Sequence, residues 1–542
     1  MKSNNKIILI NPPTTDPQET SLYFPMALLT LGGVIKKTGF EAELWDFDLF
    51  FKRSGNCSEN HFKKLLKHGV LGANTPIFAI SSICSNFPMA LWMAQQIKEI
   101  LPESLIVLGG PQPSSLPKEI LEHFPCVDLV VCGEGEIPLE QLIKYDFSRE
   151  AFKEIPGLAY RQDRVNSKDG VIQMNDRPAL IENLDDIPFP DYSLINFQDY
   201  IREKPGQFFV NVEVGRGCPF KCTFCSTSIM WARKFRVKSP KRIFDEMMWL
   251  YRHYGFTAFD FIHDNFTTSR KFVLDFCHYM IENNHKNFKW FSSSRTDCID
   301  NARVDLMQEA GLVGLFFGLE SGSERMQKVI QKNLDFAHFE NLLTHVNNKK
   351  LRNTTAFILG FPEETLDDMN ATIRKAMHYK SLGTQRVFLS KLSALAGTGI
   401  HQKNKDQLKE LSYCSTLSPQ KYALEEINQL IEQYPDLFSS FYHVPHPECS
   451  LEYLTKFIEF SHLLVNGDAK WILNFMDENH LEASEIFHYW EPWSEQKGIY
   501  YQHYRQLAMK QFHSIFEEFL NFVEKSIAAD GVTHETPIKQ AL

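Results

Sequence analysis

The first part of the chain alternates short apolar runs with amphipathic stretches. Its apolar runs predict β-strands at residues 6–10, 41–47, 77–81, 105–110 and 127–133. Apolar residues at helical spacing predict helices at residues 26–37, 89–100 and 138–143. Strands that alternate with helices are typical of an α/β fold with a parallel sheet and helices on both faces. We therefore expect an open α/β domain over residues 1–145.

The rest of the chain divides into three further segments. Residues 146–207 predict a connector, with a hairpin around Lys168, Asp169 and Gly170 and then the extended stretch DDIPFPDY. A second series of strands that alternate with helices follows, with strands predicted at residues 209–214, 258–264, 290–295, 314–320, 354–360 and 386–392. These repeats are too few for a closed βα barrel, so residues 208–400 predict a partial (β/α)6 barrel. Residues 401–542 predict a helical domain rich in aromatic residues.

Charge and hydropathy narrow the classes of partner and compartment. The formal net charge of −10 argues against a protein that binds nucleic acid through a broad basic surface. No stretch approaches the roughly 18 apolar residues of a membrane span, and the first apolar run, IILI, is too short for a secretion signal. The 11 cysteines are unevenly spread, which favours metal binding or catalysis over a disulfide framework. We expect a cytoplasmic protein that neither binds nucleic acid nor spans a membrane.

Three cysteines stand close together in the segment GCPFKCTFC. Cys218, Cys222 and Cys225 follow the spacing C-x3-C-x2-C directly after a predicted strand, where βα-barrel enzymes place their chemistry. Structural zinc uses four ligands, so a zinc site would need a remote partner such as Cys277, Cys298 or a histidine. An iron–sulfur cluster also takes thiolate ligands, and three protein thiolates leave one iron free for an exogenous ligand. The spacing therefore favours a cluster with an open position.

The cysteine loop resembles the signature of the radical S-adenosylmethionine (radical SAM) enzymes. In that family a 4Fe-4S cluster on three cysteines binds S-adenosylmethionine (SAM) at its open iron, and one electron cleaves SAM to a 5'-deoxyadenosyl radical. The resemblance covers residues 208–400 and implies Cys218, Cys222 and Cys225 as the cluster ligands. Phe224 occupies the family's usual aromatic position before the last cysteine.

Three later segments of the barrel extend this resemblance. GLESGS is similar to the family's fourth-strand segment and implies that Glu320 and Ser321 contact SAM. ILGFPEET is similar to the fifth-strand motif and implies that Gly360 lies at the adenine, although Ala356 stands where a glycine is usual. Arg295, at the end of the third strand, is implied to help hold the methionyl part of SAM.

The first domain resembles the Rossmann-like cobalamin-binding domain that precedes the barrel in a large radical SAM subfamily. The segments FPMALLTLGGVIKKTGFEAELWDFD, LGGPQPSSLPKEI and VDLVVCGEGEIPLEQL carry this resemblance, which spans about residues 5–400 with the connector included. It implies cobalamin contacts at the turns after the strands, namely Asn11, Pro12, Gly109, Gly110, Gln112, Gly133 and Glu134. Other cobalamin enzymes place a histidine under the cobalt through a D-x-H-x-x-G motif, and no histidine of this chain lies in such a motif. We therefore expect no histidine on the lower face of the cobalt. A degenerate domain that serves only packing or substrate contact is the alternative.

The two implied cofactors define the function that we expect. It is that of a cobalamin-dependent radical SAM methyltransferase acting on an unactivated carbon, or a phosphinate phosphorus, of a small molecule or peptide. The electron donor is expected to be a flavodoxin or ferredoxin. The alternatives are a radical SAM cyclase or rearrangement enzyme without methyl transfer, and a corrinoid or iron–sulfur sensor. The sequence does not identify the substrate or any further catalytic residue.

Overall fold

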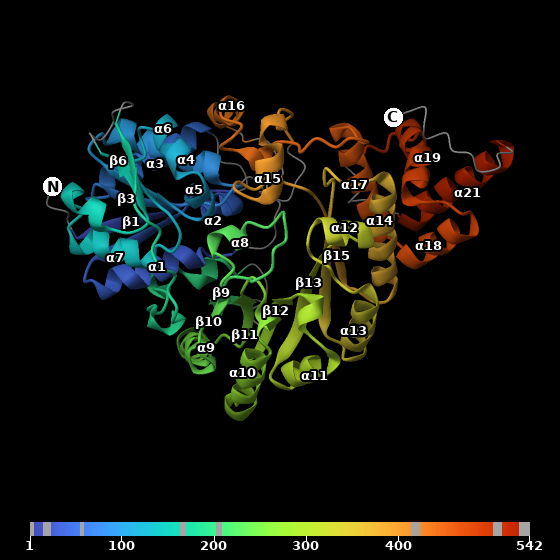
Figure 1. Cartoon of the computed structure of the whole chain (residues 1–542), viewed down its shortest axis with the longest axis horizontal. Helices are drawn as coiled ribbons and strands as arrows, with labels where there is room; N and C mark the ends of the chain where they lie inside the picture. Colours follow the sequence, from blue (N-terminus) through green and yellow to red (C-terminus); the bar gives the residue numbers. More distant parts are fainter. Residues whose placement is uncertain are drawn as a thin grey trace.

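The structure is a computed structural model that describes residues 5–14, 23–54, 59–162, 170–201, 209–412, 422, 424–501 and 512–530. Lys168 and Asp169 of the predicted hairpin lie outside the described residues, as do residues 202–207 of the predicted connector and residue 208 of the predicted barrel. Within the described part of the chain, two mainly parallel sheets stand side by side, and the C-terminal helices lie in two groups, one near the first sheet and one beside the second (Figure 1).

The first sheet has the strand order β2-β1-β3-β4-β5-β6-β7. Its strands are β1 (Lys6–Asn11), β2 (Glu41–Asp46), β3 (Ile77–Ser81), β4 (Leu105–Gly109), β5 (Leu129–Val131), β6 (Leu158–Arg161) and β7 (Ile172–Met174). Strands β1 to β5 run parallel, whereas β6 and β7 form an antiparallel hairpin beside β5. The order β2-β1-β3-β4-β5 is that of a doubly wound sheet, whose ligands bind beyond the carboxyl ends of the strands. This confirms the predicted α/β fold of the first domain.

Alternating residues of β1 bury both faces of this sheet under helices. Ile7 and Leu9 pack in one cluster with residues of α1 (Met26–Lys37) and α7 (Glu136–Lys144). Ile8 and Ile10 pack in another cluster with residues of α3 (Glu59–Gly72) and α4 (Phe87–Ile100). The helices α2 (Phe47–Ser54) and α3 were not predicted, and short helices α5 (Pro111–Ser115) and α6 (Pro117–His123) follow β4.

The second sheet is a partial barrel with the strand order β15-β14-β13-β12-β11-β8, all parallel. Its strands are β8 (Val210–Glu213), β11 (Ala258–Ile262), β12 (Lys289–Ser294), β13 (Leu312–Glu320), β14 (Arg352–Leu359) and β15 (Arg386–Lys391). The helices α9 (Pro240–Tyr254), α10 (Arg270–Asn283), α11 (Asn301–Glu309), α13 (Phe336–Asn348) and α14 (Leu366–Ser381) lie between successive strands, and short α12 (Glu324–Val329) follows β13. Six parallel strands in chain order confirm the predicted partial barrel.

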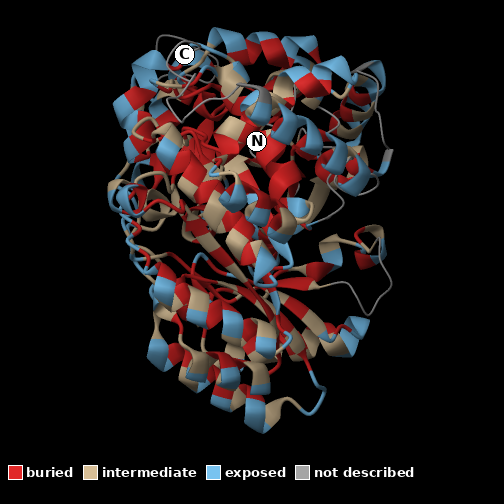
Figure 2. Ribbon diagram, turned by 90° about the vertical axis from the view of Figure 1, so that its right-hand side faces the viewer, coloured by how far each residue is buried: buried red, intermediate tan, exposed pale blue. Residues whose placement is uncertain are grey.

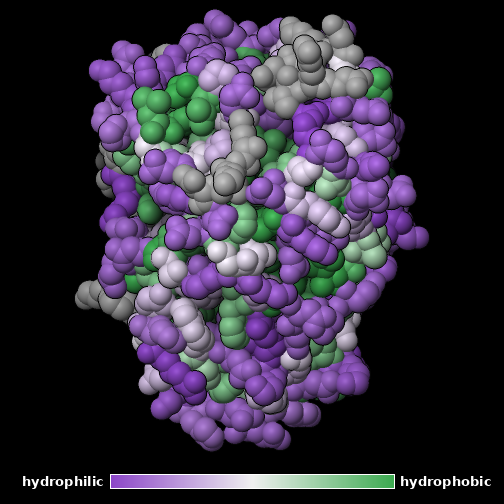
Figure 3. Space-filling model, turned by 90° about the vertical axis from the view of Figure 1, so that its left-hand side faces the viewer, coloured by the Kyte–Doolittle hydropathy of each residue, from purple (hydrophilic) through white to green (hydrophobic). Residues whose placement is uncertain are grey.

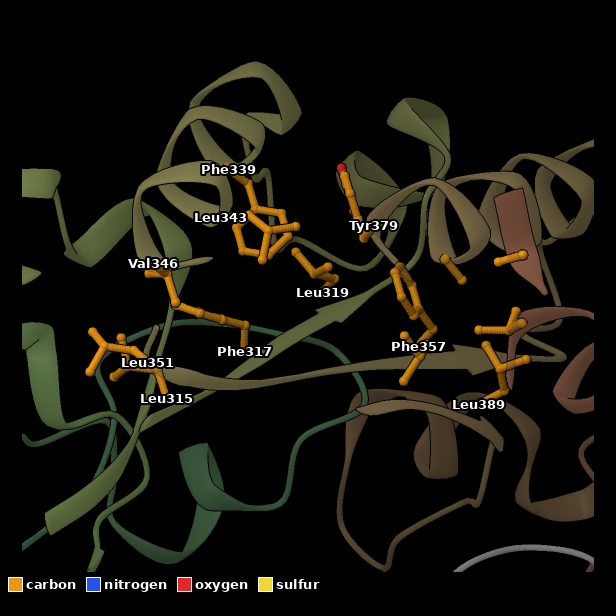
Figure 4. Close-up of a cluster of buried hydrophobic side chains, with 14 of the residues drawn as sticks. Leu315, Phe317, Leu319, Phe339, Leu343, Val346, Leu351, Phe357, Tyr379 and Leu389 are labelled. Carbon is orange, nitrogen blue, oxygen red and sulfur yellow. The ribbon is translucent and has the colours of Figure 1, made fainter. Parts of the chain in front are cut away.

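Side chains on alternate positions of the barrel strands separate its outer core from its interior. Leu315, Phe317 and Leu319 of β13 lie with Phe339 and Leu343 of α13 in a buried cluster (Figure 4). Successive residues of a strand point to opposite faces, so Gly318 and Glu320 face the interior of the barrel. Burial follows the same division, with the strands mostly buried and the outer faces of the helices exposed (Figure 2).

The C-terminal region is helical, as predicted, but it packs in two separate places (Figure 1). Helix α15 (Gly399–Asn404) and α16 (Glu425–Gln433) lie over the first domain, where the Trp92 indole donates to Glu426 at 2.7 Å. The remaining helices, α17 (Leu451–Asn466), α18 (Ala469–Glu478), α19 (Ala483–Gln496) and α21 (Phe512–Asp530), share the core of the barrel beside α14 and β15. The region therefore covers both domains rather than forming a separate body.

The helices and the surface of the described residues bear on contact with a membrane. None of their helices is long and apolar enough to span a membrane. The side of the molecule that carries the first sheet is largely hydrophilic, with small hydrophobic groups scattered over it (Figure 3).

Candidate active site

The start of the cysteine loop is held in place by the strand β9 before it and by the backbone of Gly217. It follows the short strand β9 (Gly215–Arg216), which pairs with β10 (Arg236–Val237). Gly217 has φ +90°, and a Cβ there would lie 1.9 Å from the Lys234 carbonyl oxygen, so only glycine fits. The Gly217 N–H also donates to the Asp264 carboxylate at 2.7 Å. The first cysteine is therefore held at the carboxyl edge of the barrel.

The three thiols of this loop have the chemistry that a cluster requires. Cys218, Cys222 and Cys225 are free and half-buried. Burial raises the pKa of the Cys218 thiol to about 11 and raises that of Cys222, while the nearby cations Lys332 and Arg295 oppose the rise at Cys222. Thiols bind metal as thiolates, so metal binding would release these protons. Cations beside a set of thiolates fit the negative charge of an iron–sulfur cluster.

The described residues do not form the closed ligand set of a single metal ion. They hold no group of three or more His, Cys, Asp or Glu side chains that could bind one. Cys277 lies fully buried in the hydrophobic core, and the Cys298 sulfur accepts from the Asn265 amide at 3.5 Å. Neither remote cysteine joins the loop as a fourth zinc ligand. The loop therefore offers three thiols, without a fourth ligand from these two cysteines.

The residues implied to contact SAM lie on neighbouring strands of the barrel. Glu320 has the left-handed φ of +67° at a register shift between β13 and β14, and its carboxylate accepts from Lys332 Nζ at 2.7 Å. A Cβ at Gly318 would lie 2.4 Å from Glu320 Oε1, so the carboxylate folds back over a glycine. Residues held in this region of φ cluster at ligand sites. The role of Glu320 toward SAM stays a prediction.

The other residues implied to contact SAM differ in the contacts that they already make within the protein. Phe224 packs edge-to-face on Phe361, with ring centres 5.8 Å apart, directly after Gly360. Gly360 has φ +87°, and its N–H donates to the buried Glu364 carboxyl at 2.6 Å. Ser321 is fully buried, and its hydroxyl lies 3.2 Å from the Thr372 hydroxyl of α14. Arg295 lies against the cysteine loop, with Nη1 3.6 Å from Cys222 Sγ. Their roles toward SAM stay predictions.

A mostly apolar cavity of about 340 Å³ opens at the carboxyl edge of the first sheet. Gly109, Gly110, Gly133 and Glu134 line it. Gly110 has φ +106°, and a Cβ there would lie 2.2 Å from the Ser82 carbonyl oxygen. At Gly133, by contrast, a Cβ would meet no atom within 4 Å, so the missing side chain leaves open space. The volume lies in the usual range of about 300–1,000 Å³ for small-molecule sites, and the glycine cradle fits part of a large cofactor.

Three of the predicted cobalamin residues do not line this cavity. The Asn11 amide donates to Asp46 at 2.8 Å, and the Pro12 carbonyl accepts from Asn86 at 3.1 Å. The buried Gln112 amide donates to the Leu437 carbonyl of the C-terminal region at 2.9 Å. Among the described residues that line the cavity, none is a histidine. That no histidine binds the lower face of the cobalt stays a prediction.

A buried charge network joins the cavity to the cysteine loop. Glu134 accepts from Arg216 at 2.7 Å and from Arg236 at 2.9 Å, and Arg216 also pairs with Glu136 at 2.6 Å and Glu213 at 2.9 Å. Both guanidinium groups lie near the Trp231 ring, which lines the cavity. Arg216 comes two residues before Cys218. The sequence reasoning named Glu134 alone, because nothing in the sequence pairs charges this far apart.

Comparison with known proteins assigns both domains. Residues 212–376 match the family model of the Radical SAM superfamily, and residues 20–143 match the model of the B12 binding domain. The first match contains the cysteine loop and the strands β11 to β14, and the second contains the glycine turns of the cavity.

Several curated proteins are similar over about two thirds of the chain. An uncharacterized methyltransferase of Pyrococcus horikoshii is 28% identical over 374 residues, which is 68% of this chain and 77% of the relative. A cytidylyl-2-hydroxyethylphosphonate methyltransferase of Streptomyces wedmorensis is 26% identical, over 68% of this chain and 76% of the relative. An anaerobic magnesium-protoporphyrin IX monomethyl ester cyclase of Cereibacter sphaeroides is 27% identical, over 66% and 56%.

Two solved structures have a similar fold over most of the chain. The cobalamin-dependent SAM radical enzyme OxsB, with aqua-cobalamin bound, aligns with a TM-score of 0.63 at 16% identity, over 98% of this chain and 82% of that one. The radical SAM methyltransferase TsrM of Kitasatospora setae, with cobalamin and a 4Fe-4S cluster bound, aligns with a TM-score of 0.60 at 18% identity, over 74% and 78%. At these identities the likeness concerns the fold.

The thiol loop on a partial barrel and the glycine cavity on a doubly wound sheet define an iron–sulfur radical enzyme with a second site for a corrinoid. The two domain matches agree with that geometry. The chain carries a B12 binding domain and a Radical SAM domain, which imply cobalamin, a 4Fe-4S cluster and SAM as its cofactors. The alternative of a corrinoid or iron–sulfur sensor without catalysis is thereby disfavoured.

Proposed function

We propose that the protein is a radical SAM methyltransferase that transfers a methyl group from SAM to an unactivated carbon, or a phosphinate phosphorus, of a small molecule or peptide. One observation carries the proposal: residues of both domains line the same cavity. Met230 and Trp231, which follow the cysteine loop, and Ile262 of β11 line the same cavity as Gly110 and Gly133 of the first domain.

The chemistry balances with two molecules of SAM and two electrons. When bound, the cluster supplies reductive cleavage of SAM and cobalamin supplies a carrier for the methyl group. The substrate hydrogen passes to 5'-deoxyadenosine, with methionine released. The methyl group of the other SAM forms the new bond and leaves S-adenosylhomocysteine. A flavodoxin or ferredoxin is the electron donor that we propose.

The chain's own part in this reaction is to hold the ligands at fixed positions. Cys218, Cys222 and Cys225 would hold the cluster, Glu320 would contact SAM, and the glycine turns would hold the corrinoid. Ile262 of β11 and Phe388 of β15 are apolar side chains, 38% and 44% exposed, on the strands of the barrel. We infer that the substrate lies between these strands and the cavity. The strands would fix its position closely, since a misplacement of about 1 Å can cost roughly 100-fold in rate.

The experiment that tests methyl transfer uses the full chain, purified without oxygen and loaded with corrinoid, cluster and a reducing system. Candidate substrates are incubated with methyl-deuterated SAM and analysed by mass spectrometry. The expected result is a trideuteromethylated product formed in equal amounts with 5'-deoxyadenosine and S-adenosylhomocysteine. A cyclised or rearranged product with 5'-deoxyadenosine but no S-adenosylhomocysteine would instead assign the second function, that of a cyclase.

The similarity to a curated cyclase keeps that second function open. It is disfavoured because two of the similar curated proteins are described as methyltransferases and cover more of their own length in the alignment. We further propose that the enzyme works in the cytoplasm and has no nucleic-acid partner. The free state of the described cysteines and the net charge of −10 support these two points.

A further inference from the structure

Arg295 is held on every side by residues of the cluster and SAM segments. Its Nε and Nη2 donate to the Asp297 carboxylate at 3.0 and 2.9 Å, and Nη2 also donates to the Lys332 carbonyl at 2.8 Å. The guanidinium carbon lies 3.7 Å from the centre of the Phe220 ring. The remaining nitrogen, Nη1, lies 3.6 Å from Cys222 Sγ. The residue is 7% exposed.

These contacts fix the direction of one N–H bond. A guanidinium is a rigid planar fork, and a bidentate carboxylate together with a stacked ring sets its plane. Asp297 holds one edge of the fork and Phe220 covers its face, so Nη1 points at the sulfur. Lys332, which receives the Arg295 hydrogen bond on its carbonyl, donates from its own Nζ to Glu320 at 2.7 Å.

We propose that Arg295 is a positioning residue of the iron–sulfur centre, which donates a charge-assisted hydrogen bond to the Cys222 thiolate and raises the reduction potential of the cluster. The contact with the methionyl part of SAM that the sequence implied for Arg295 stays a separate prediction. The proposal rests on the cluster and not on methyl transfer.

The physical reason for the direction of the effect is the added negative charge of the reduced cluster. Hydrogen bonds to the sulfurs and nearby charge are among the factors that set the potentials of iron–sulfur clusters. A cation that donates to a thiolate stabilises the reduced state more than the oxidised state. Asp297 is 35% exposed, so solvent screens its opposing charge more than that of Arg295. The neighbouring Lys332 is already paired with Glu320.

The test compares Arg295→Gln with wild type as full-length protein carrying a reconstituted cluster, without SAM or substrate. The cluster is titrated potentiometrically, and its reduced state is followed by electron paramagnetic resonance. We expect the ratio of oxidised to reduced cluster at a fixed potential to rise about tenfold, which is a shift of about 59 mV to more negative potential. Arg295→Lys keeps the charge and loses the fork, so its potential should fall between the two.

Arg303→Lys is the matched control, because Arg303 pairs with Asp300 at 3.1 Å in the next helix and does not contact a loop cysteine. Its potential should equal that of wild type. Arg295→Gln with full iron content and an unchanged potential and spectrum would overturn the proposal and leave Arg295 a purely structural role. If Arg295→Gln does not retain its cluster, an unchanged potential in Arg295→Lys would overturn it equally.

Discussion

Replacing Glu134 by glutamine removes the counter-charge of a buried cation. The side chains of Glu134 and Arg236 are each 3% exposed, and Arg236 donates both to Glu134 and to the Ile181 carbonyl. Its Nε and Nη2 have no hydrogen-bond partner among the described residues. Breaking a buried pair by removing one partner costs about 3–5 kcal/mol. Because Arg216 keeps Glu136 and Glu213, we expect the lower value, about 3 kcal/mol.

The cost should appear as local opening between the first domain and the cysteine loop. About 3 kcal/mol corresponds to an increase of roughly a hundredfold in the opening constant, which native-state hydrogen exchange measures segment by segment. Peptides that cover residues 129–136 and 210–217 should exchange faster in Glu134→Gln, while α13 should not change. The control is Glu182→Gln, whose pair with Lys234 is exposed and screened by solvent, so its exchange should equal that of wild type. If these peptides exchange in Glu134→Gln as they do in wild type, the Glu134 ion pair does not hold the first domain against the cysteine loop.

Three further predictions concern the metal, the corrinoid and a buried carboxyl. Alanine at Cys218, Cys222 or Cys225 should abolish the brown absorbance and the iron content of the reconstituted protein, whereas Cys277→Ala should retain both; iron loss in Cys277→Ala would contradict the three-thiolate site. Electron paramagnetic resonance of the bound cobalt(II) corrinoid should lack nitrogen superhyperfine splitting, and its presence would show a nitrogen ligand. Burial raises the pKa of Glu364 from 4.5 to about 8, so the folded state binds more protons than the unfolded state between these pH values. Stability should therefore fall as pH rises from 4.5 towards 8, and Glu364→Gln should weaken this dependence. Identical slopes of melting temperature against pH in wild type and Glu364→Gln would show that Glu364 does not cause it.

Periodicity and local chemistry predicted most of the framework. The parallel strands of both sheets follow the apolar runs of the sequence. Helix α9 begins at Pro240, with Ser239 as its N-cap, which are residue types that favour these two positions. Helix α3 was missed although Phe62, Leu66 and Val70 recur at helical spacing and are buried. The cysteine spacing was equally local, and it indicated the cluster before any fold was known.

Long-range pairing was beyond the sequence. The hairpin of β6 and β7 was predicted within a connector, yet it extends the first sheet by pairing with β5. Arg295 was assigned to SAM because its position on the third strand is local information. Its contacts with Phe220 and Lys332 depend on how distant loops meet at the barrel edge. The same reason hides the pairs that Glu134 makes with Arg216 and Arg236.

The boundary between the two sites limits how enzymes of this family can be recombined. A chimaera that exchanges only the first domain would place a foreign loop against Trp231 and the two arginines that hold Glu134. Residues 215–237 of the barrel therefore form one exchangeable unit with residues 133–136, even though the connector lies between them in the chain. A library of hybrids cut at the connector alone would separate these charges, whereas one that moves both segments together would keep Glu134 and Glu136 with the arginines that pair with them.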